Sequence, residues 1–166
     1  MPLPYIQINK IISNSGDSVG PEGPAGPPGP PSNQPFDLQI FSGEYATTSV
    51  SPIRFGSRFL DLTAYPSVDT AGRARQIEFV VDIEVGVAGT GHIHLMNRDD
   101  SEVVTGTELT TLSLINVEIS SGSLTVGTSI GNLKDAKMYE VEAYHTGGAA
   151  TDSVAITNAR LEVVYV

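Results

Sequence analysis

Two histidines are the first residues whose type and spacing could do chemistry. His92 and His94 stand two positions apart in Gly91-His92-Ile93-His94, so on a β-strand both side chains project from the same face. Such a pair can supply two metal ligands, and a trimer could bring three copies of it to its axis. The alternative is a pair of polar side chains on a solvated or intersubunit face. We predict this second arrangement and therefore no metal site; metal binding by the pair is the alternative hypothesis.

Carboxylates form two further groups. Asp99, Asp100 and Glu102 lie close together in a short acidic turn, but they lack the ligand spacing of an EF-hand calcium loop. Glu140 and Glu142 share one face of a predicted strand. A glycosidase needs two carboxylates that flank the substrate, and these usually come from different elements. We therefore predict that Glu140 and Glu142 are solvated carboxylates of a strand.

The arginines and the tyrosines could each serve either in binding or in ordinary surface charge and packing. Four of the nine basic residues could dock an acidic partner or pair with a neighbouring subunit, or they are ordinary surface charge. Four tyrosines could stack on a sugar, but aromatic residues make up 7% of the chain and tryptophan is missing, so packing in a core or interface is the default. The residues are Arg54, Arg58, Arg73 and Arg75, and Tyr5, Tyr45, Tyr65 and Tyr144.

No catalytic residue and no cofactor is predicted. The chain has no cysteine, which excludes disulfide frameworks, thiolate metal sites and cysteine nucleophiles. It also lacks a P-loop, an HEXXH zinc motif and a nucleophile elbow. The formal charge of −10 repels nucleic acid and anionic membranes, so neither is an expected partner. No basic n-region followed by an apolar h-region, and no long apolar run, is visible in the sequence.

The elements that carry these residues are predicted to be strands. Residues 77–85 place apolar side chains on one face, whereas Gln76, Glu78, Asp82 and Glu84 face the other way. Clusters of Gly, Ser, Asn and Asp separate the segments, and no window shows helical periodicity. The predicted strands are residues 37–41, 58–64, 76–85, 91–96, 109–119, 136–145 and 159–166. This pattern predicts an all-β fold, an antiparallel, jelly-roll-like β-sandwich over residues 32–166, which we call the head.

A collagen-like repeat precedes the head. Residues 20–31 are four Gly-X-Y triplets with proline at every X position. Only glycine fits at the axis where three polyproline-II chains wind together, so the strict period predicts a triple helix with Gly20, Gly23, Gly26 and Gly29 on its axis. The alternative is a stiff proline-rich spacer or a ligand for a PxxP-reading domain. These twelve residues, the stalk, would span about 35 Å; so short a triple helix needs a trimeric contact elsewhere in the chain.

An N-terminal arm and linker, residues 1–19, completes the predicted organisation. Residues 5–12 form a short extended segment with an apolar stripe, and a strand of this length is unstable alone in water. We therefore expect it to pair with a partner's strand edge or with the other two arms. The predicted anchoring residues are Tyr5, Ile6, Ile8, Ile11 and Ile12.

Arm, collagen-like stalk and β-sandwich head together resemble collagen-stalked trimeric bacteriophage surface proteins, which include head-decoration proteins, head fibres and tail spikes. The resemblance covers the plan of the chain and rests on residues 20–31 and on the β character of residues 36–166. Secreted proteins with complement-like heads share the plan. Their core strand carries a Gly-X-Tyr-X-Phe pattern, and residues 137–144 here lack its glycine and second aromatic register.

The resemblance implies a non-enzymatic structural protein of the virion surface, a parallel homotrimer made in the host cytoplasm. Its expected partners are two further copies of itself and a capsid or baseplate protein bound through the arm. The alternative is a receptor-binding tail fibre or spike protein that recognises a host-surface glycan or protein.

Overall fold

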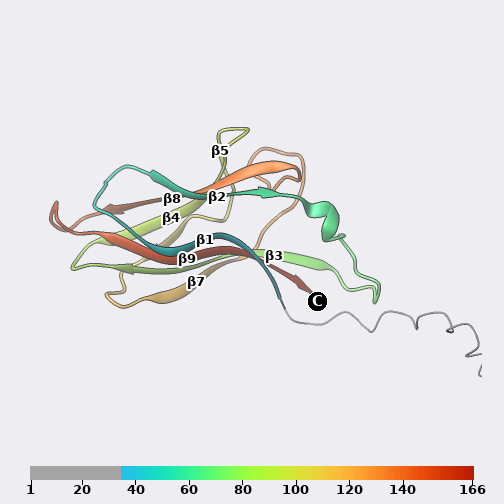
Figure 1. Ribbon diagram of the computed structural model, residues 1–166, viewed down its shortest axis with the longest axis horizontal. Coiled ribbons are helices and arrows are strands. Elements are labelled where there is room, and N and C mark those ends of the chain that lie inside the picture. The colour runs from blue at the N-terminus through green and yellow to red at the C-terminus, as the bar shows by residue number, and fades with distance from the viewer. Residues whose placement is uncertain (1–34) are drawn as a thin grey trace, which may run out of the picture.

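The computed structural model describes residues 35–166; the predicted arm and stalk lie outside the described residues. Within this range the chain folds into two antiparallel sheets packed face to face, with one 3-10 turn, η2 (Leu62–Ala64) (Figure 1). The predicted all-β sandwich is confirmed. Among the described residues, no helix is long and apolar enough to cross a membrane.

The first sheet has the strand order β1-β9-β3-β7, and the second has the order β2-β8-β4-β5, with β6 also paired to β4. The strands are β1 (Phe36–Thr47), β2 (Ile53–Leu60), β3 (Arg75–Val85), β4 (Thr90–Asn97), β5 (Glu102–Val103), β6 (Leu109–Thr111), β7 (Val117–Ser123), β8 (Lys137–Thr146) and β9 (Val154–Tyr165).

The pairing of the strands is nested. β1 pairs with β9, β2 with β8, β3 with β7 and β4 with β6, all antiparallel. This is the arrangement of a long hairpin rolled into two sheets, the jelly roll. The pattern of apolar segments could not show this topology, because it does not say which strands are neighbours.

Alternating apolar side chains fill the space between the sheets. Ile77, Phe79, Val81 and Ile83 of β3 are at most 1% exposed and pack among the inward residues of β4, β8 and β9. Each fully buried aliphatic or phenylalanine side chain stabilises the fold by about 1.5–3 kcal/mol. The face predicted for residues 77–85 is therefore confirmed as the core face.

Four predicted strands were wrong in extent. The segments 37–41 and 159–166 belong to the much longer strands β1 and β9. The segment 109–119 is two strands, because β6 belongs to the second sheet and β7 to the first, and the chain crosses between sheets at residues 112–116. The segment 58–64 ends as a strand at Leu60, where Asp61 accepts a hydrogen bond from the Thr63 N–H and begins η2. The strand itself begins earlier, at Ile53, and a bulge at Gly56 interrupts its alternation.

The sandwich has two different ends. The chain enters at Phe36, which pairs with Val163 near the C-terminus, and we call this end the base (right in Figure 1). Four loops lie at the opposite end, the tip (left in Figure 1). They are residues 48–52, 86–89, 112–116 and 147–153.

Candidate functional site

Several of the predicted residues meet on the outer face of the second sheet. In the register of this sheet Glu142 of β8 stands opposite Arg54 of β2 on one side and opposite His94 of β4 on the other. Their neighbours Val141, Ala143, Ile93 and Leu95 point into the core. Alternation along three adjacent strands therefore gathers charged side chains in one row.

Glu142 is the centre of this row, and the prediction that it is solvated was wrong. It is 5% exposed; its Oε1 accepts a hydrogen bond from Arg54 Nε at 2.7 Å, and its Oε2 lies 2.9 Å from His94 Nε2. The hydrogen bond to Glu142 is the main cause that raises the pKa of the Arg54 guanidinium. Flanking long side chains cover the carboxylate, which the pattern of one strand could not show.

Glu140 continues the network toward the base. Its Oε1 lies 3.2 Å from Arg98 Nη1, and its Oε2 lies 3.6 Å from Arg54 Nη1. The two glutamates thus project from one strand toward Arg54 of β2 and toward Arg98, which directly follows β4. They do not face each other across a cleft as the carboxylates of a glycosidase do.

His92 lies on the same face as His94, as predicted, but it has different neighbours. Its Nε2 is 2.8 Å from Thr146 Oγ1, and its ring stacks on that of Tyr144 with centroids 4.5 Å apart. Burial, together with the nearby Glu108, raises the pKa of the Tyr144 hydroxyl. Among residues 35–166, no three His, Asp or Glu side chains are grouped so that they could hold a metal ion.

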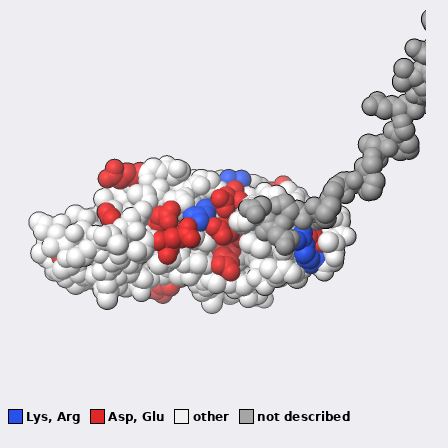
Figure 2. Space-filling model, turned by 90° about the horizontal axis from the view of Figure 1, so that it is seen from below, with Lys and Arg blue, Asp and Glu red and all other residues white. Residues whose placement is uncertain are grey.

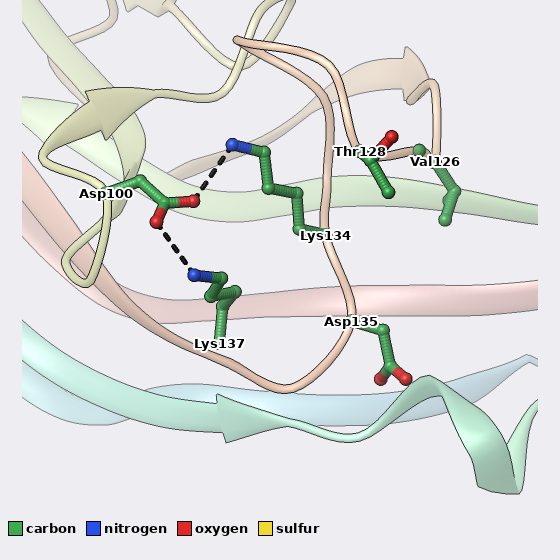
Figure 3. A pocket seen from close by; sticks show the side chains of 7 residues that line it. Asp100, Val126, Thr128, Lys134, Asp135 and Lys137 are labelled. Atoms are coloured by element: carbon green, nitrogen blue, oxygen red, sulfur yellow. Dashed lines mark hydrogen bonds and ion pairs between the residues drawn. The ribbon is translucent and has the colours of Figure 1, made fainter.

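The acidic turn borders a pocket of about 430 Å³ near the base end of β8 (Figure 3). Asp100 accepts hydrogen bonds from Lys137 Nζ at 2.7 Å and from Lys134 Nζ at 2.9 Å. These two hydrogen bonds, of which the one from Lys137 has the larger effect, lower the pKa of Asp100 to about 2. Glu102 also pairs with Lys134, whereas Asp99 accepts from the Met138 N–H. The carboxylates that could have formed a calcium site thus pair with lysines or accept a hydrogen bond from the backbone.

The sequence interpretation missed the two lysines of this pocket. Residues 132–137 carry no motif, and only the fold brings the loop before β8 against the turn after β4. The buried Tyr139 fixes that loop, because its hydroxyl accepts from the Lys134 N–H at 2.7 Å and donates to the Lys134 carbonyl at 3.0 Å. Burial is the main cause that raises the pKa of Tyr139 to about 12.

The four arginines are not brought together, and each has a partner within the chain. Arg54 belongs to the network described above, Arg58 donates to the Gln39 carbonyl at 3.0 Å, and Arg75 donates to the Tyr65 carbonyl. Arg73 Nε pairs with Asp69 Oδ2 at 2.7 Å. Within residues 35–166, these four arginines therefore form no cluster for an acidic partner.

The tyrosines are also dispersed. Tyr45 stacks on Phe55 with centroids 4.4 Å apart, and Tyr65 contacts Phe36 at 6.0 Å. Packing, the default interpretation, is confirmed for these two residues. Tyr5 lies outside the described residues, as do the other predicted anchoring residues of the arm and the four axial glycines of the stalk.

A charged cluster that the sequence interpretation missed lies in the middle of the outer face of the first sheet (Figure 2). Arg160 donates to Glu118 at 2.7 Å and to Glu162 at 2.6 Å. Asp37 and Asp82 lie within 3.9 Å of the same guanidinium. The single guanidinium of Arg160 thus holds together carboxylates from four strands. Because four carboxylates surround one cation, this face remains acidic.

Comparisons with known proteins show a weak likeness in fold to part of a viral structure. No family model matches the chain, and no curated protein does. A chain of the solved structure of infectious bursal disease virus, Gx strain, matches 79% of this chain with 15% sequence identity and a TM-score of 0.38. The match spans 29% of that longer chain.

Proposed function

We propose that this protein is a non-enzymatic structural component of a virion surface, a trimeric capsid decoration or head-fibre protein of the phage type. In this proposal the arm binds a capsid or baseplate protein, the stalk lifts the head from the particle, and the head is displayed outward. No reaction is part of the proposal.

One observation carries it: the Gly-X-Y repeat leads directly into one end of a jelly roll. The repeat ends at Pro31 and β1 begins at Phe36, at the base of the head (Figure 1). A triple helix there would join the three chains at the bases of their heads and place the tips at the ends far from the stalk. This is the plan of an anchored and displayed trimer.

The charge of the head supports display on a particle. The outer face of the first sheet presents carboxylates around Arg160 (Figure 2), and the chain has a formal charge of −10. Such a surface stays solvated and repels DNA released from lysed cells.

The test is to locate the protein on intact particles and then to remove it. Antibodies against residues 36–166 should label many sites over the capsid, and particles without the protein should stay infectious with a bare or less robust capsid. Deleting residues 1–15 should abolish attachment and leave the trimer intact. Label confined to the tail, with loss of adsorption when the protein is removed, would overturn the proposal.

The pocket of Figure 3 favours a second candidate, receptor binding. It combines lysine ammonium groups, the Asp100 carboxylate and the Thr128 hydroxyl around a volume of about 430 Å³, and polar groups of this kind can orient a glycan. In that case Thr128→Ala and Lys137→Ala should each reduce adsorption of particles to host cells. Unchanged adsorption by both variants would leave decoration as the sole proposal.

A further inference from the structure

The tip differs from the rest of the head in its lack of exposed charge. Asp152 is the only Asp, Glu, Lys or Arg in the four tip loops, and it is 3% exposed because it accepts the Ala149 N–H at 2.6 Å. The base loops, by contrast, carry charges of both signs. In Figure 2 the tip end of the molecule is almost entirely white.

The tip also exposes large aliphatic side chains. Val50 is 68% exposed, Val87 71%, Leu112 72%, Leu114 61% and Ile115 71%. An exposed apolar patch without charge is a common mark of a contact surface between proteins.

These side chains stand on loops that are hydrogen-bonded to the strand ends or to another tip loop. The Val85 N–H donates to the Ser113 carbonyl at 2.8 Å, and the Gly86 N–H donates to the Ser153 carbonyl at 2.8 Å. On the other side, the His145 N–H donates to the Ser49 carbonyl at 2.9 Å. The aliphatic residues are therefore presented in a fixed arrangement, which lowers the entropic cost of docking.

The exposed aliphatics form two patches on opposite edges of the sandwich. The first patch is Val50 with Ile53, between the edge strands β1 and β2. The second patch is Leu112, Leu114 and Ile115 with Val87 beside them, between the edge strands β6 and β7. Two different patches at the same level of the molecule suit a head-to-tail contact, the kind that closes a ring.

We propose that the first patch of one copy packs against the second patch of the next, so that three heads close a ring at their tips. The inference rests on the proposed homotrimer and names its contact. Copies of a chain with a charge of −10 repel each other over their acidic faces, and the tip is a surface where they can approach without this cost. The contact also supplies the register that a stalk of twelve residues needs.

The first experiment compares masses of the full chain and of two aspartate variants by light scattering at micromolar concentration. The wild type should have three times the 17.5 kDa mass of one chain, and Leu114→Asp should fall to the mass of one chain. The matched control is Ile130→Asp, because Ile130 is 88% exposed but lies outside the tip, and it should stay trimeric. A Leu114→Asp variant that stayed trimeric would overturn the inference. If particles that carry this trimeric variant also failed to adsorb to host cells, the tip would be a contact surface for a foreign partner. A monomeric wild type would instead overturn the proposed function.

The second experiment uses the absence of native cysteine. The double variant Val50→Cys, Leu114→Cys should form a covalent trimer under mild oxidation, because each copy links to the next around the ring. Each single variant should yield no covalent trimer. The contact would be refuted if the double variant stayed uncross-linked, or if Leu114→Cys alone cross-linked equally well, which would put like patches against each other.

Discussion

At the scale of single residues, burial decides what the charged side chains of this head do. Glu142 lies on a sheet face that alternation assigns to solvent, yet Arg54 and His94 enclose it. A buried carboxylate is tolerated when its oxygens are paired, and removing its charge leaves its partners uncompensated. The same principle applies to Arg160 on the other sheet.

We predict that Glu142→Gln lowers the free energy of unfolding by about 1–2 kcal/mol, since the amide cannot accept equally from Arg54 and His94. Urea denaturation at fixed protein concentration measures this. Glu44→Gln is the matched control because Glu44 is exposed, and it should change the value by less than about 0.5 kcal/mol. Equal effects of the two changes would contradict a structural role of the network.

A second residue-scale prediction concerns Tyr139. Its pKa in the folded protein is raised from 10.0 to about 12, chiefly by burial. Because the folded value is the higher one, the contribution of the neutral hydroxyl to stability is complete below about pH 10 and is lost as the pH rises through about 12.

The absorbance of tyrosinate during an alkaline titration tests this. The difference between wild type and Tyr139→Phe should titrate with a midpoint of about 12, and with a midpoint of about 10 in denaturant. A midpoint of about 10 in the folded protein would show that the hydroxyl is not buried.

At the scale of elements, bends and crossings rather than straight strands shape the head. Gly56 forms a bulge in β2 with a φ of +59°, and a Cβ at this position would lie 2.8 Å from the Cβ of Phe41 in the neighbouring sheet. The bulge thus allows a close approach of β2 to β1 that no other residue type permits.

We therefore predict that Gly56→Ala destabilises the head more than Gly72→Ala does. Gly72 also has a positive φ, of +82°, but a Cβ there would meet nothing within 4 Å. Gly72→Ala should cost about 1 kcal/mol for the backbone alone, and Gly56→Ala about 1–3 kcal/mol more because of crowding. Thermal unfolding of both variants measures the difference, and equal midpoints would rule out the steric contact.

At the scale of the whole molecule, the base and the tip have different properties. The stalk would enter at the base beside charged loops, whereas the tip exposes aliphatic residues and no charge (Figures 1 and 2). Under our two proposals the heads, rather than the stalk, hold the three chains together.

This view predicts that Gly26→Ala disrupts the stalk and leaves the heads trimeric, because a Cβ does not fit at the axis of a triple helix. Circular dichroism should show loss of the collagen-like signal, while light scattering still gives the mass of three chains. Ala25→Ser, at the Y position of the preceding triplet, should preserve both signals. Dissociation of the Gly26→Ala protein into single chains would show that the stalk, not the head, sets the assembly.

The sequence by itself determined the all-β class, the core face of residues 77–85 and the collagen-like period of residues 20–31, because these depend on repeats along the chain. It also placed His92 and His94 on one face. Tertiary structure alone decided that Glu142 is buried, that the lysines at 134 and 137 meet Asp100, and that residues 109–119 divide between two sheets. The uncharged loops were visible in the sequence, but only the nested strand order brings them to one end. Local periodicity records which way a side chain points, whereas neighbours across strands follow from the packing of distant segments.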